Sequence, residues 1–132
     1  ATDDDQAYFK FQTDATNSEA FTDFTLLHFV HSIADTDYIS ALPITVAADT
    51  EYHLKIVIDS NRKAAIYVNG IQYNITSTSG STGGTAVTTG TGKTAALTDD
   101  VDFIPYIGVE TGAGSAKALK VHWQAISRLI NE

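Results

Sequence analysis

The clearest pattern in the chain lies between residues 52 and 75, where apolar and polar side chains alternate. A side-chain period of two is typical of a strand that buries one face. The polar run at residues 60–63 interrupts the alternation, which predicts a loop between two strands. The positions predicted to share an apolar face are Tyr52, Leu54, Ile56 and Ile58 in the first strand and Ala64, Ile66 and Val68 in the second.

The pair Asn69-Gly70 follows the second of these strands and predicts a tight hairpin turn. Both residues accept the positive φ of a type I′ turn, whose twist matches the flanking strands. Alternation then continues through Ile71, Tyr73 and Ile75. Three antiparallel strands in a row form a meander, and its apolar face requires a second layer to cover it.

Further short strands are predicted on both sides of the meander. Residues 24–31 are apolar on both faces and rich in β-forming side chains, which predicts a central strand within residues 21–33. Pro43 restricts its surroundings to a sheet edge or a strand start, so two short strands are expected around it. The remaining segments predicted as strands are residues 7–12, 38–42, 44–46, 103–110 and 117–129.

In the last of these segments, alternation predicts an inward face, and the reversal at residues 125–126 predicts a β-bulge. The residues placed inward are Leu119, Val121, Trp123 and Ala125.

Residues 76–97 consist largely of Ser, Thr, Gly and Ala, with few large side chains. A structureless loop of this length is uncommon in a compact domain. One interpretation is a surface excursion at a ligand-binding or subunit-contact edge. The composition favours the other, a weak edge hairpin with arms at residues 85–89 and 94–97 across Gly90 and Gly92.

Many short strands separated by polar turns predict an all-β fold, an antiparallel β-sandwich. At 132 residues the chain has the length of one domain, so residues 1–132 are interpreted as a single sandwich.

Two parts of the sequence resemble a known family. The order Tyr52-His-Leu-x-Ile-x-Ile-Asp59 followed by Ile66-Tyr-Val-Asn-Gly70 resembles the central hairpin of concanavalin A-like domains, the lectin and laminin-G jelly rolls. Residues 103–110 and 117–124 are similar to the closing strands of such domains in tailed-phage virion proteins. The resemblance covers about the C-terminal two thirds of the chain, and it implies a jelly-roll fold in a virion particle.

Composition narrows the classes of function. The formal net charge of −8 disfavours nucleic-acid binding, which depends on Lys and Arg at phosphates. No apolar run approaches the ~20 residues of a membrane-spanning helix. Cysteine is absent, which excludes disulfides and thiolate metal sites. Methionine is also absent, even at position 1, so we expect a processed or trimmed chain or an excised domain.

No catalytic set is recognisable in the sequence. Residues 90–94, Gly-Thr-Gly-Lys-Thr, imitate a phosphate-binding loop, but Val87 stands where the full motif requires glycine. Glycosidases carry two carboxylates on one face, about 5.5 Å apart in retaining enzymes, and no predicted strand carries such a pair. A nucleophile elbow of the form Gly-x-Ser-x-Gly is also missing. We therefore expect a protein that is not an enzyme.

Calcium is the ion that the sequence favours, because relatives in the resembled family bind it with loop carboxylates and carbonyls. The candidate ligands are Asp99, Asp100 and Asp102, with Asp35 and Asp37 as a second pair. Aspartates in turns more often cap the turn through their own hydrogen bonds. His28 and His31 are three residues apart and fall on opposite faces of a strand, so a shared metal is not expected.

The leading hypothesis is a non-enzymatic structural module of a tailed-phage virion, acting as a capsid decoration, tail or fibre domain in assembly or surface attachment. Its partners would be other virion proteins or copies of itself, with no nucleic acid and no membrane. The alternative is a carbohydrate-binding, lectin-like module that acts with or without calcium. A degenerate glycan hydrolase is the third hypothesis.

Overall fold

The computed structural model describes residues 5–13, 23–98, 104–109 and 118–127. The chain divides into two compact units, Ala1–Val101 and Asp102–Glu132, which we call the first and second units. All seven assigned strands lie in the first unit, and the described residues contain no helix. A helix long and apolar enough to cross a membrane is therefore also missing from these residues.

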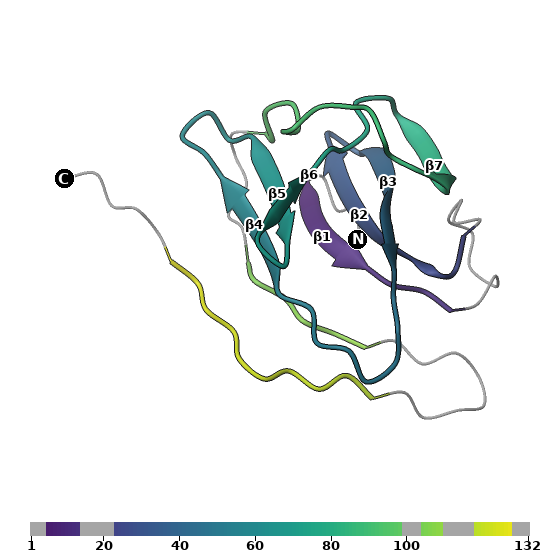
Figure 1. The fold of residues 1–132 in the computed structure, drawn as a ribbon. Helices are drawn as coiled ribbons and strands as arrows, with labels where there is room; N and C mark the ends of the chain where they lie inside the picture. The colour runs from purple at the N-terminus through teal and green to yellow at the C-terminus, as the bar shows by residue number, and fades with distance from the viewer. Residues whose placement is uncertain (1–4, 14–22, 99–103, 110–117, 128–132) are drawn as a thin grey trace. The chain divides into compact units, whose positions relative to one another are not determined.

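The strands of the first unit form two sheets (Figure 1). The four-stranded sheet has the order β1-β2-β3-β7, and the three-stranded sheet has the order β4-β5-β6. The bounds are β1 Gln6–Lys10, β2 Leu26–Ile33, β3 Thr36–Thr45, β4 Leu54–Ile58, β5 Ala64–Val68, β6 Ile71–Tyr73 and β7 Gly80–Ala86.

Side chains from both sheets meet in one apolar core, which confirms the predicted β-sandwich. Phe29 and Leu42 come from the four-stranded sheet, Ile66 and Val68 come from β5, and all four are at most 2% exposed. Phe9 of β1 packs edge-on against Phe29, with ring centroids 5.6 Å apart. The apolar face of the meander is thus covered by the other sheet, as its pattern requires.

Strand β2 is buried on both faces, as its continuous apolar sequence predicts. Phe29 points into the core between the sheets. Its neighbour Val30 points the other way and forms a second, smaller cluster with Ile39, Tyr8 and Phe24. β2 lies between β1 and β3, which confirms its predicted central place.

The structure confirms the predicted meander of three antiparallel strands. Strand β4 pairs with β5 and β5 with β6, both antiparallel. Asn69 and Gly70 have φ values of 51° and 82°, as a type I′ turn requires. The Asn69 side-chain oxygen accepts a hydrogen bond from the His53 backbone N–H at 2.8 Å, which secures the turn to the start of β4.

The prediction of two short strands around Pro43 is wrong, because β3 runs through it. Pairing with β2 shifts register between Leu26 and His28, opposite the segment that holds Pro43. A proline lacks the N–H that a regular ladder uses, and an irregularity of this kind removes that requirement.

The predicted hairpin within residues 76–97 is also wrong. Strand β7 begins at Gly80, earlier than expected, and pairs in parallel with β3. The segment after it turns to the other sheet, where Thr94 and Leu97 donate backbone hydrogen bonds to the carbonyls of Ala64 and Arg62 at 2.9 and 3.0 Å. The expected all-antiparallel pairing therefore needs this one correction among the described strands.

In the second unit, residues 104–109 and 118–127 are described and carry no strand, which contradicts the strands predicted there. Trp123, placed in the core by its alternation, is 58% exposed. Alternation sets which side chains share a face, but a strand also needs hydrogen bonds to a neighbour. The sequence pattern contains no information on that neighbour.

We predict that Phe29→Ala lowers the free energy of unfolding by about 3–5 kcal/mol, because it leaves a cavity at the centre of the core. Urea denaturation followed by circular dichroism measures the change. Val57→Ala on β4 is the control, because Val57 is 37% exposed and its loss should cost less than about 1 kcal/mol. Equal losses in the two variants would contradict the assigned core.

Candidate functional site

A pocket of about 450 Å³ opens in the first unit, where the core between the two sheets ends. His31, Ile33 and Tyr38 come from β2 and β3, and the other lining residues come from the loop before β5, from residues 76–77 and from the segment around residue 93. Most of its lining side chains can donate or accept hydrogen bonds. They are His31, Ile33, Tyr38, Lys63, Thr76, Ser77, Thr91, Lys93, Thr94 and Ala95.

His31 reaches this pocket because it continues the inward row of β2. Its ring stacks on Tyr38, with centroids 4.7 Å apart and planes 10° apart, and more distantly on Phe29. The ring is 2% exposed, and its Nδ1 has no hydrogen-bond partner in the described structure. An unsatisfied buried polar atom costs about 1–3 kcal/mol, so such an atom beside a pocket calls for an explanation.

Burial lowers the pKa of His31 from 6.5 to about 4, because a charged ring loses its hydration there. The imidazole is therefore neutral near pH 7. A neutral imidazole carries one N–H donor and one acceptor nitrogen. His31 thus offers hydrogen bonding to the pocket without adding charge.

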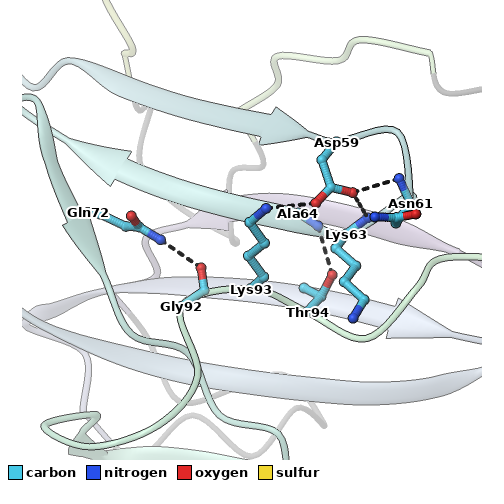
Figure 2. Close-up of polar contacts among 8 residues, drawn as sticks. All are labelled: Asp59, Asn61, Lys63, Ala64, Gln72, Gly92, Lys93 and Thr94. Atoms are coloured by element: carbon cyan, nitrogen blue, oxygen red, sulfur yellow. Dashed lines mark hydrogen bonds and ion pairs between the residues drawn. The ribbon is translucent and has the colours of Figure 1, made fainter.

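The opposite wall is organised by the carboxylate of Asp59 (Figure 2). One oxygen accepts the backbone N–H groups of Asn61 and Lys63 at 2.9 and 3.0 Å. The other oxygen forms an ion pair with Lys93 Nζ at 2.7 Å. These contacts, led by the Lys93 hydrogen bond, lower the pKa of Asp59 to about 2. Asp59 therefore fixes the 60–63 loop and the segment around residue 93 to each other.

Further contacts hold that segment in place. The Thr94 hydroxyl accepts the Ala64 N–H at 2.9 Å, and the Gln72 side chain donates to the Gly92 carbonyl at 2.9 Å (Figure 2). At Gly90 an added Cβ would lie 2.4 Å from the Ile75 carbonyl oxygen, so only glycine fits this approach. The glycines here serve close packing, and no helix follows in the described chain to complete a phosphate-binding loop.

The predicted calcium ligands Asp99, Asp100 and Asp102 lie outside the described residues. Of the second pair, Asp35 occupies the turn before β3 with φ 62°, and Asp37 accepts a hydrogen bond from the Ser32 hydroxyl. Within the described part of the chain, no three His, Asp or Glu side chains gather as a metal site. His28 and His31 point to opposite faces of β2, as predicted.

The pocket itself was not identified from the sequence. The sequence contains one weak indication of the pocket. His31 lies two residues after Phe29 and therefore on the same face of the strand, where it is a polar side chain on an otherwise apolar face. Lys63 and Thr94 come from loops, and only the fold brings them to the same place.

A second feature is the set of large apolar side chains that remain exposed. On β4 these are Leu54, Val57 and Ile58, at 37–41% exposure. In the second unit every large apolar side chain described is at least 47% exposed, namely those of Ile104, Tyr106, Ile107, Val109, Leu119, Val121, Trp123 and Ile126.

Comparison of the chain with family models, with curated proteins and with solved structures finds no match.

We predict that acid destabilises the protein through His31. Its folded pKa of about 4 lies below its ordinary value of 6.5, so the unfolded chain takes up the proton first. The contribution is complete above pH 6.5 and is lost as the pH falls toward 4, by up to roughly 3 kcal/mol. His31→Phe, which keeps the stacking with Tyr38, should remove this pH dependence.

Urea unfolding between pH 7 and 4 measures the effect. His53→Gln is the control, because His53 is exposed and outside the pocket. A wild type and a His31→Phe variant that lose stability in parallel would contradict the role given to His31.

Proposed function

We propose that this chain is a non-enzymatic structural module of a tailed-phage virion, with the concanavalin A-like topology that its sequence resembles. The two-sheet sandwich supports the coarser part of this proposal. The sequence resemblance of residues 52–70 supports the jelly-roll part of the proposal. The resemblance of residues 103–110 and 117–124 supports the location in an extracellular particle by sequence alone, because their described residues form no strand.

The observation that carries the proposal is the exposed apolar surface of the second unit. Large apolar patches on a protein surface mark interaction sites, because their contact with water is unfavourable. Trp123 and Ile104, at 58% and 85% exposure, are side chains of the type that anchors protein interfaces or cores. A module that assembles with neighbours in a particle would bury them.

Strand β4 offers a complementary feature. It is an edge of the three-stranded sheet, and Leu54, Val57 and Ile58 add exposed apolar area along it. An edge strand presents unpaired backbone groups that another strand can bind. The partners we propose are therefore other virion proteins or further copies of this chain.

We predict that the purified chain self-associates and that the C-terminal alternation drives this. Light scattering after size-exclusion chromatography should give a mass above the 14.1 kDa monomer that falls on dilution. A triple substitution of Leu119, Val121 and Trp123 to Ser should return the monomer, because it removes the apolar area that association buries.

The matched control replaces Lys120, His122 and Gln124, the intervening polar positions, with Ser and should leave the mass unchanged. A wild-type monomer at every concentration, or equal effects of the two triple variants, would overturn self-association through this segment. Genes adjacent in the source genome test the virion assignment, since capsid or tail genes support it and a polysaccharide-degradation cluster contradicts it.

A second candidate function, carbohydrate binding, is supported by the pocket. Its lining of hydroxyl groups and the Tyr38 ring provides the hydrogen-bonding and aromatic contacts that sugars use. Calcium bound by Asp99, Asp100 and Asp102 would be an additional element of this proposal.

For this candidate we predict binding on a glycan array that persists in a chelator, because no carboxylate is among the described residues that line the pocket. Binding that disappears with the chelator would move the contact from the pocket to the predicted calcium site. An array without any bound glycan would contradict the candidate function.

A further inference from the structure

The pocket beside His31 differs in charge from the rest of the molecule. The chain carries a formal net charge of −8, yet the described lining contains two lysines and no carboxylate. The charge of Lys93 is compensated, because its Nζ lies 2.7 Å from Asp59. The charge of Lys63 is the one that a ligand would meet.

Lys63 is placed for this role by its backbone. Its N–H donates to Asp59 at 3.0 Å, which fixes the start of the side chain. The side chain then extends away from the Asp59 carboxylate and past Thr94 (Figure 2). Among the described residues, no carboxylate forms an ion pair with it. An ammonium group that has no carboxylate partner in the described part of the chain matches a singly charged anion such as a carboxylate.

The remaining lining groups match hydroxyls. Thr76, Ser77 and Thr91 carry side-chain hydroxyls, and the His31 ring adds a neutral nitrogen, Nδ1, without a partner in the described structure. Thr91 already donates to the Lys93 carbonyl and can accept from a ligand, whereas Thr76 accepts the Thr78 N–H and can donate. A ligand hydroxyl can both donate and accept, so it can satisfy a neutral imidazole nitrogen in either tautomer. Ile33 and Ala95 supply the apolar area that a carbon skeleton needs. The volume of about 450 Å³ lies within the usual range of small-molecule sites.

We infer that this pocket binds a small hydroxylated carboxylate, with its carboxylate at Lys63 and its hydroxyls at His31 and the threonine and serine side chains. This chemistry occurs in sugar acids, free or at the end of a glycan, and in open-chain hydroxy acids. The inference does not depend on the assembly proposal, because the pocket lies wholly in the first unit.

The test is a titration of the full chain, followed by ¹H–¹⁵N NMR, with glucuronate, gluconate, glucose, acetate and inorganic phosphate as separate probes. We expect glucuronate or gluconate to bind at least about 10-fold more tightly than glucose and acetate. Glucuronate alone would identify a sugar acid as the source, and gluconate alone an open-chain acid.

Lys63→Gln should weaken that binding about 10-fold or more, and Lys55→Gln should leave it unchanged. Lys55 is the matched control because it is a lysine on β4, over the Tyr67 ring and outside the pocket. Retained chemical-shift dispersion shows that each variant is folded.

Four results would overturn the inference. Glucose binding as tightly as glucuronate would remove the role of charge, and acetate doing so would remove the role of the hydroxyls. Phosphate binding most tightly would assign the pocket to a different anion. A pocket that binds none of the five probes would refute the inference, while leaving the self-association result unaffected.

Discussion

The structure depends on one contact, the apolar packing of β5 against the core-facing side of β2 and β3. Ile66 and Val68 meet Phe29 and Leu42 there, and each is almost fully removed from water. A three-stranded meander has too little apolar area on one face to be stable without a cover. The four-stranded sheet provides that cover, so the two sheets stabilise each other.

The pocket lies where this apolar packing ends. Along the inward row of β2, Phe29 is followed by His31, and the core changes there from apolar to polar. Beyond this point polar contacts replace apolar ones. Thr76 N–H, just after β6, donates to the Ser40 hydroxyl of β3 at 3.0 Å. The Arg62 guanidinium donates to the Leu97 carbonyl at 3.0 Å and holds the segment after the pocket on the side of the three-stranded sheet.

Asp5 strengthens the same end of the sandwich from outside. Its carboxylate accepts the Ala34 N–H at 2.9 Å, and it also accepts hydrogen bonds from Thr98. Desolvation raises the pKa of Asp5, but the hydrogen bonds from Ala34 and Thr98 together outweigh it, so the pKa is lowered. One acidic side chain near the N-terminus thus joins the β2–β3 turn to the segment that follows the pocket wall. An acidic residue close to the N-terminus thus has a structural role.

Local patterns predicted the parts of the fold whose cause is local. Asn69 and Gly70 adopt the turn that their own backbone preferences favour, and β2 is buried on both faces because both of its faces are apolar. The position of β7 depends instead on a partner 42 residues away, since Gly80 pairs with Tyr38. Small residues in that segment carry no facing pattern, so the sequence could not specify this pairing.

The pocket escaped prediction for the same reason. Its lining comes from four separate stretches of the chain, and each looks ordinary alone: a histidine in a strand, a lysine in a loop, a threonine after a glycine. Only the ladder positions that set Tyr38 opposite His31, and the contact of Thr94 with Ala64, bring them together.

The exposed apolar residues and the polar pocket have different physical demands. Burying Trp123 and the other exposed apolar side chains of the second unit would lower the free energy, because their surface would be removed from water. This gain is non-directional, so it does not require one particular contact geometry. A ligand at Lys63 and His31 would need a defined shape, because a misplaced hydroxyl would leave a buried nitrogen unsatisfied. Under the two proposals, association would depend on the apolar area buried, whereas recognition would depend on directed hydrogen bonds.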